Sequence, residues 1–197
     1  MHYLAAIFQS ILLTIPNILT FIRILLIPFF IGSFYLPVEW ANQLSALLFA
    51  LAAVTDWLDG FLARRWQQTS PLGAFLDPVA DKLMVAAALV VLVQADPTIF
   101  MVVPAVVIIG REITISALRE WMAELGARAQ VAVSVIGKFK TATQMLALVL
   151  MIYRDDLLGL PIYTIGYVLL YVSVVLTLWS MMVYIQAAWP SLSGKQR

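Results

Sequence analysis

Four aspartates lie in two short segments, DWLDGFLAR and GAFLDPVAD, of an otherwise apolar chain. Asp56 and Asp59 are three residues apart, and Asp77 and Asp81 are four apart. Side chains at these spacings share one face of an α-helix, so we expect each pair of carboxylates to point the same way. Paired carboxylates of this kind can bind hard cations or act as a general acid and base.

Small residues accompany both pairs. At about 100° per residue, Gly60 and Ala63 continue the face of the first pair, and Gly73 and Ala80 lie on the face of the second. Small side chains leave room for a bulky ligand to lie against the helix backbone. Arg64 lies at the edge of the first face.

The two segments are joined by the short stretch RWQQTSPL, so we expect antiparallel neighbouring helices whose four aspartates converge. Each close pair of ionised carboxylates would cost about 4 kcal/mol at an effective dielectric near 20. Either some of them are protonated or cations bind. Two divalent cations would balance four negative charges, and an all-oxygen ligand set favours Mg²⁺ or Mn²⁺. Two such cations are suited to phosphoryl transfer. A single pair of aspartates, by contrast, is also typical of a solvated helix end.

The composition indicates an integral membrane protein. The 197 residues are 63% hydrophobic and 12% charged, with a mean hydropathy of +0.96. Soluble domains are about half apolar and about one quarter charged. There is no cysteine, which excludes disulfides and thiolate-bound zinc. The net charge of +1 gives no basic field for nucleic acid.

The apolar runs predict one all-α domain, a bundle of six transmembrane helices preceded by an interfacial helix. A span needs about 20 apolar residues. The N-terminal segment is too short for a span but has helical apolar spacing, so we expect it to lie in the membrane interface. The alternative is that it frays or extends the first span. The interfacial helix is expected at about 3–14, and the spans at about 17–35, 43–63, 73–93, 99–121, 137–153 and 162–187.

The basic residues predict the orientation. Eleven of the twelve Lys and Arg lie at the termini, near the start of the first span, or beside the loops after the second and fourth spans; Arg154 is the exception. Because cytoplasmic loops carry the excess of basic residues, both termini and the aspartates are expected to face the cytoplasm.

Four of these basic residues could form an anion-binding pocket. Arg111 and Arg119 are two helical turns apart, on roughly one face. Lys138 and Lys140 point nearly opposite ways, so we expect one of them to face inward. Such a pocket suits a second, anionic substrate, because Arg binds phosphate through two hydrogen bonds. Membrane topology alone would also place basic residues here.

The pattern D-x-x-D-G-x-x-A-R, eight residues, then G-x-x-x-D-x-x-x-D resembles the signature of the CDP-alcohol phosphatidyltransferase family, with every position present. The resemblance implies transfer of a phosphatidyl group from CDP-diacylglycerol to an alcohol, with release of CMP. It also implies two Mg²⁺ or Mn²⁺ ions, a homodimer and a place in the bacterial inner membrane. The implied metal ligands are Asp56, Asp59, Asp77 and Asp81, with Asp81 a ligand or the general base. The residues implied in holding the CDP-lipid are Asp56, Gly60, Ala63, Arg64, Gly73 and Asp77.

The segment PNILTFIRILLIPFF extends the resemblance to the bacterial branch of the family that uses sn-glycerol 3-phosphate. The acceptor's phosphate would then be bound by residues drawn from Arg111, Arg119, Lys138 and Lys140. Asn17, Thr20 and Arg23 belong to this resemblance as well. From the residues alone, Asn17 is expected to cap a helix, and Arg23 to extend its charge towards the interface.

Other functions remain open at this point. Within the family, the acceptor could be phosphatidylglycerol, serine or an inositol phosphate. Outside the family, intramembrane aspartates can line the path of a cation transporter, but transporters usually show interrupted helices in two repeated halves. A purely structural bundle is the third alternative, and the four-aspartate pattern argues against it.

Overall fold

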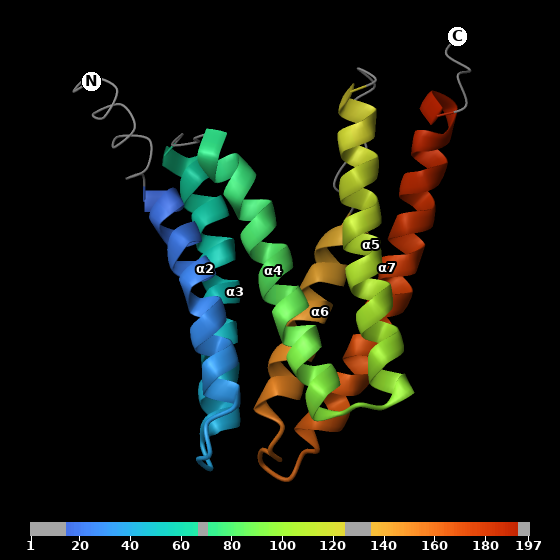
Figure 1. Ribbon diagram of the computed structural model, residues 1–197. Coiled ribbons are helices and arrows are strands. Elements are labelled where there is room, and N and C mark those ends of the chain that lie inside the picture. Colours follow the sequence, from blue (N-terminus) through green and yellow to red (C-terminus); the bar gives the residue numbers. More distant parts are fainter. Residues whose placement is uncertain (1–14, 67–70, 125–134, 193–197) are drawn as a thin grey trace, which may run out of the picture. The chain divides into compact units, whose positions relative to one another are not determined.

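The chain is all-helical in the part that the computed structural model describes, residues 15–66, 71–124 and 135–192 (Figure 1). The expected all-α class is therefore confirmed. The expected interfacial helix, at about 3–14, lies outside the described residues. Six helices follow one another in the described part: α2 (Ile15–Phe34), α3 (Ala41–Trp66), α4 (Pro71–Ala95), α5 (Ile99–Glu124), α6 (Val135–Tyr153) and α7 (Ile162–Leu192).

Three of these helices are long and apolar enough to cross a membrane, within α2, α5 and α7: Asn17–Phe34, Ile99–Glu124 and Ile162–Gln186. Shorter apolar stretches lie in α3 and α6. Large apolar side chains also face outward, among them Phe29 and Val175, which are 60% and 64% exposed. An outward apolar surface is costly in water and favourable in lipid, so both observations indicate an integral membrane protein.

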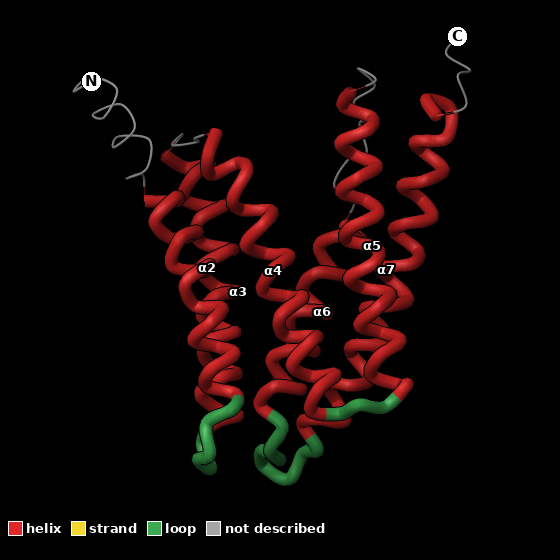
Figure 2. Tube along the Cα trace, viewed as in Figure 1, coloured by secondary structure: helices red, strands yellow, loops and turns green. Residues whose placement is uncertain are grey.

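Most of the helices extend beyond the apolar runs that predicted them. α3 continues to Trp66, α4 begins at Pro71 and α7 continues to Leu192. Hydropathy marks the part of a helix that prefers lipid, whereas backbone hydrogen bonds carry the helix on into polar sequence. Three loops between helices are short, at 35–40, 96–98 and 154–161 (Figure 2).

The fold divides into two compact units. The first contains α2, α3, α4 as far as Val91, and the segment Ile152–Asp156. Here α2 packs along α3, with the rings of Phe30 and Phe49 5.8 Å apart (Figure 1). Beside them the buried hydroxyls of Ser33 and Ser45 share a 2.8 Å hydrogen bond. Small polar side chains of this kind let two membrane helices approach closely.

The second unit contains Leu92–Met151 and the chain from Leu157 onward, and so holds α5, α7 and most of α6. The α7 helix approaches α6 closely at Gly166. A Cβ atom there would lie 2.8 Å from the Cγ of Met151 and 3.0 Å from the carbonyl oxygen of Ala147. On its other side α7 contacts α5, where the Tyr171 hydroxyl donates to the Phe100 carbonyl oxygen at 2.8 Å.

Candidate functional site

The acidic site of the first unit is held together by α2. The guanidinium of Arg23 donates from Nη1 to Oδ1 of Asp56, on α3, at 2.5 Å. One turn earlier, the Thr20 hydroxyl donates to Oδ1 of Asp77, on α4, at 2.5 Å. The two carboxylates lie close enough to repel each other electrostatically. The structure thus brings together one aspartate from each predicted pair.

The face of α2 that meets these carboxylates is polar and fully buried. Asn17, Thr20 and Arg23 are each at most 1% exposed, whereas the side chain of Asp56 is 41% exposed. Two expectations are therefore wrong. Asn17 lies inside α2, which begins at Ile15, and does not precede it as a cap. Arg23 does not extend its charge into solvent, because it is buried and pairs with the Asp56 carboxylate.

The small residues of α4 lie where their spacing predicts. Ala80 is fully buried and Gly73 is buried, while Asp77 and Asp81 on the same face are partly exposed. This face therefore leaves its carboxylates accessible beside a tightly packed backbone. The side chains at the remaining positions of the signature lie outside the described residues: Asp59, Gly60, Ala63 and Arg64.

The oxygen atoms of this site suit a hard cation. Asp56 and Asp77 contribute carboxylates from neighbouring helices, and Mg²⁺ is usually bound by one or two carboxylates together with ligand phosphates. Arg23 donates to Oδ1 of Asp56, and among the described side chains no other bond to this carboxylate competes with a ligand at Oδ2. Among the side chains that the structure describes, no three acidic residues or histidines lie close enough to share one ion. A site with more protein ligands would have to include Asp59.

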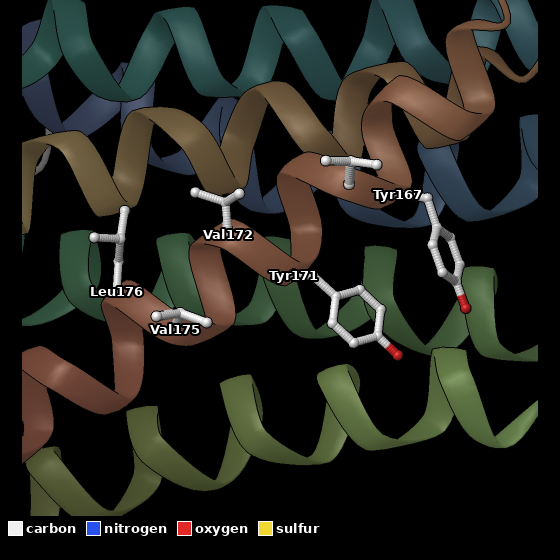
Figure 3. A pocket seen from close by; sticks show the side chains of 6 residues that line it. Tyr167, Tyr171, Val172, Val175 and Leu176 are labelled. Carbon is white, nitrogen blue, oxygen red and sulfur yellow. The ribbon is translucent and has the colours of Figure 1, made fainter.

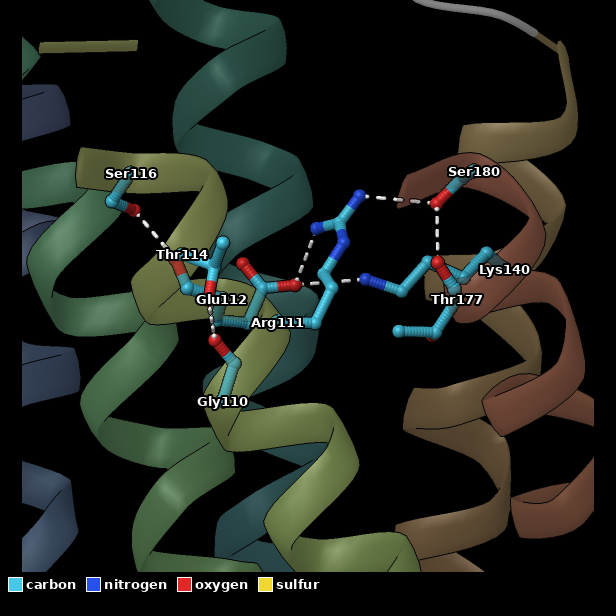
Figure 4. Close-up of polar contacts among 8 residues, drawn as sticks. All are labelled: Gly110, Arg111, Glu112, Thr114, Ser116, Lys140, Thr177 and Ser180. Atoms are coloured by element: carbon cyan, nitrogen blue, oxygen red, sulfur yellow. Dashed lines mark hydrogen bonds and ion pairs between the residues drawn. The ribbon is translucent and has the colours of Figure 1, made fainter. Parts of the chain in front are cut away.

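A second charged cluster lies in the other unit, where α5, α6 and α7 meet (Figure 4). One oxygen of Glu112, Oε1, accepts from Nη1 of Arg111 at 2.7 Å and from Nζ of Lys140 at 2.8 Å. Arg111 also donates from Nη2 to the Ser180 hydroxyl at 3.1 Å. The side chain of Lys140 is only 6% exposed. Of the two lysines left open by the sequence, Lys140 therefore faces inward; the side chain of Lys138 is outside the described residues.

The arginines of α5 both face α7. They therefore share one face of the helix, as their spacing predicts. Arg111 reaches Ser180, and the guanidinium carbon of Arg119 lies 5.5 Å from the ring centroid of Tyr184. Arg119 is exposed, and this cation–π contact holds it against α7. Arg111 thus lies in the buried cluster, while Arg119 lies two turns further along α5.

A pocket of about 440 Å³ lies along α7 and has a different character (Figure 3). Its lining is aliphatic apart from two tyrosine rings at one end, and it contains no charged side chain. It therefore supplies neither metal ligands nor an acid–base pair. The lining residues are Tyr167, Val168, Tyr171, Val172, Val175 and Leu176.

Comparison with known proteins identifies the family. The sequence profile of the CDP-alcohol phosphatidyltransferases matches residues 13–179. The chain belongs to this family. Similar proteins include one from Sodalis glossinidius, 58% identical over 177 residues, which cover 89% of this chain and 95% of that protein. One from Pectobacterium atrosepticum is 56% identical over 174 residues, covering 88% and 94%. One from Yersinia enterocolitica is 54% identical over 180 residues, covering 91% and 97%. All three are named CDP-diacylglycerol–glycerol-3-phosphate 3-phosphatidyltransferase.

Within this family member, the structure adds four side chains that the sequence did not single out as site residues: Thr20, Arg23, Glu112 and Ser180. A usable signal existed for two of them. Arg23 and Glu112 are ionisable residues inside apolar helices, where such groups are usually paired and functional. Thr20 belongs to the segment that resembles the family, but as hydroxyl residues Thr20 and Ser180 gave no such signal of their own, because Ser and Thr are common in membrane helices.

Proposed function

We propose that the chain transfers the phosphatidyl group of CDP-diacylglycerol to sn-glycerol 3-phosphate, giving phosphatidylglycerophosphate and CMP. This is the committed step towards phosphatidylglycerol and cardiolipin. One observation carries the proposal. The three relatives named for this reaction are each more than 50% identical to the chain, over alignments that cover about nine-tenths of it. An acidic site and a separate cationic cluster fit the two substrates.

The acidic site would hold the nucleotide end of CDP-diacylglycerol. Asp56, Asp59, Asp77 and Asp81 would bind two Mg²⁺ or Mn²⁺ ions. Bound there, these ions would neutralise the diphosphate and stabilise the charge that develops on the leaving CMP. Thr20 and Arg23 support this role, because their hydrogen bonds fix the rotamers of two of the carboxylates.

The small residues beside the carboxylates would make room for the nucleotide. A side chain at Gly60, Ala63 or Gly73 would reduce the space against the backbone, and Arg64 would pair with a phosphate of CMP. The burial of Gly73 supports this assignment for α4. The diacylglycerol tails would remain in lipid, since the outward faces of the bundle are apolar.

The cationic cluster would bind the phosphate of the acceptor. Arg111 and Lys140 present charged donors from two helices, and Arg119 and Lys138 would add to the positive potential. Asp81 would take the proton from the C1 hydroxyl of glycerol 3-phosphate. The resulting alkoxide would form a bond to the phosphorus that carries the diacylglycerol, and the bond from that phosphorus to CMP would break.

The same proposal includes the membrane arrangement. The chain would form one domain of six spans in the inner membrane, with an interfacial helix at its start and both termini in the cytoplasm. The distribution of basic residues supports this orientation. It would place the acidic site on the side that contains soluble glycerol 3-phosphate. A homodimer is expected from the family.

An acceptor panel tests the proposal. The purified protein would be incubated with CDP-diacylglycerol, Mg²⁺ and labelled glycerol 3-phosphate, glycerol, serine, inositol phosphate or phosphatidylglycerol. We expect stoichiometric CMP and phosphatidylglycerophosphate from glycerol 3-phosphate, and little product from glycerol, which has no phosphate for the cations to bind. Faster turnover with another alcohol would change the assigned acceptor. Cation flux into liposomes without release of CMP would indicate a transporter instead.

A further inference from the structure

The cationic cluster already contains an anion. Both Arg111 and Lys140 donate to the same atom, Oε1 of Glu112, at 2.7 and 2.8 Å (Figure 4). This oxygen therefore occupies the point where the positive groups of α5 and α6 converge. A phosphate oxygen bound by both cations would have to take the same position.

The cluster also contains buried donors that this carboxylate does not satisfy. Nε of Arg111 and the hydroxyl of Thr177 are buried, and neither has a hydrogen-bond partner among the described residues. Thr177 is fully buried and lies one turn from Ser180, the residue that accepts from Arg111. Buried donors are nearly always paired in native proteins. A ligand with several acceptor oxygens, such as a phosphate, would satisfy donors that a single carboxylate oxygen leaves unpaired.

We propose that Glu112 is a built-in counter-ion, which occupies the phosphate position of the acceptor site and is displaced when the acceptor binds. This inference rests on the proposed function, because it takes the cluster to be the acceptor site. Glu112 would then be a positioning residue that acts through Arg111 and Lys140. It compensates their charge at membrane depth before the acceptor arrives, and it keeps their side chains in place.

Displacement follows from charge and exposure. A phosphate dianion and the Glu112 carboxylate repel each other strongly where the surroundings exclude water. The side chain of Glu112 is 25% exposed, whereas that of Lys140 is 6% exposed. The carboxylate can therefore turn outward while the lysine stays. A neutral alcohol has no charge with which to compete for the two cations, so the exchange favours acceptors that carry a phosphate.

Phosphate binding to the purified full-length protein tests this inference. Inorganic phosphate would be titrated by calorimetry against the wild type, Glu112→Gln and Glu120→Gln, the last being an exposed position on the same helix. We expect the dissociation constant to fall about fivefold or more in Glu112→Gln, within the usual range for coupled equilibria. Glu120→Gln should bind as the wild type does. The KM for glycerol 3-phosphate should fall with Glu112→Gln, while the KM for CDP-diacylglycerol stays the same.

The contrary results separate this inference from the proposed function. Equal or weaker phosphate binding by Glu112→Gln would overturn the counter-ion role. If that variant does not fold, Glu112→Asp gives the same test, since a side chain shorter by one methylene holds its carboxylate further from the two cations. It should bind phosphate more tightly than the wild type, and equal or weaker binding would again refute the role. Wild-type phosphate binding by both Arg111→Ala and Lys140→Ala would instead contradict the acceptor site itself.

Discussion

Thr20 and Arg23 make the acidic site depend on α2, a helix that carries none of the four aspartates. Both side chains are buried, and each donates to a carboxylate on a different helix. Arg23 also supplies a positive charge beside carboxylates that repel one another. The protein therefore contains part of the charge compensation that cations would otherwise have to provide.

Replacing Asp56 or Asp77 by asparagine should abolish activity. Asp56→Asn and Asp77→Asn keep the side-chain volume but remove a charged metal ligand. We expect initial rates to fall by a factor of about 10² or more, the range typical of lost catalytic groups. Asp155→Asn is the matched control, because Asp155 also accepts a short hydrogen bond but lies on an exposed loop. A variant that keeps more than a tenth of the wild-type rate would refute the assignment of that residue.

Removal of divalent cations should stop the reaction reversibly. Four carboxylates cannot stabilise the charge on the phosphate of the leaving CMP by themselves, since all the charges have the same sign. We therefore expect EDTA to abolish CMP release and added Mg²⁺ or Mn²⁺ to restore it. Circular dichroism before and after chelation would show that the helices remain. Undiminished turnover in EDTA would contradict metal dependence.

The basic cluster should govern the acceptor and not the CDP-lipid. Arg111→Ala and Lys140→Ala each remove charged hydrogen bonds, worth about 1.5–3 kcal/mol. We expect the KM for glycerol 3-phosphate to rise about 10- to 150-fold, with little change in the KM for CDP-diacylglycerol. Arg154→Asn is a suitable control, because Arg154 has a positive φ of 66°, which asparagine tolerates. Equal increases for both substrates would mean that the cluster mainly supports the fold.

In both charged sites, spacing within one helix predicted which residues share a face of that helix. It did not predict which neighbouring helix that face contacts. The faces of Asp77 with Asp81 and of Arg111 with Arg119 followed from the helical period alone. The pairing of Arg23 with Asp56, and of Glu112 with Lys140, joins residues 33 and 28 positions apart. Such pairs depend on which helices are neighbours, and apolar sequence carries little information about that in a membrane protein.

At the scale of helices, α7 packs closely against α6 at Gly166. The apolar runs predicted that both helices exist, because length and hydropathy determine that. They did not predict where each helix ends, since the backbone continues beyond the lipid-facing part. Nor did they predict the close contact at Gly166, because a glycine in an apolar run has no distinctive pattern.

Gly166→Ala should destabilise the protein, whereas Gly32→Ala should not. A Cβ at Gly166 would come within 3.0 Å of Leu150 Cβ and of the Ala147 carbonyl oxygen, so α7 would have to move. Overpacking of this kind costs about 1–3 kcal/mol. At Gly32 nothing lies within 4 Å, and alanine favours the helix by up to about 1 kcal/mol. Thermal unfolding in detergent measures both. Equal melting temperatures would show that the α6–α7 contact adapts freely.

At the scale of the whole chain, the two charged sites belong to different units, with Asp56 and Asp77 in the first and Glu112 and Lys140 in the second. The sequence links them through topology. Asp56 lies in the second half of α3, Asp77 in the first half of α4 and Lys140 in the first half of α6. If successive helices cross the membrane in alternate directions, these residues belong to the same side. The proposed reaction needs that arrangement, because both substrates must reach their sites from the cytoplasm.

Cysteine labelling in whole cells tests this arrangement directly. The chain has no cysteine, so Glu124→Cys and Asp156→Cys each introduce a single thiol, and both positions are exposed. We expect a membrane-impermeant maleimide to label Asp156→Cys in intact cells, and Glu124→Cys only after the membrane is permeabilised. The reason is that the loop at 154–161 has one basic residue beside two aspartates, whereas basic residues cluster around the end of α5 and the start of α6. Labelling of Glu124→Cys in intact cells would place the acidic site opposite the cytoplasm, away from soluble glycerol 3-phosphate, and the proposed reaction would then be excluded.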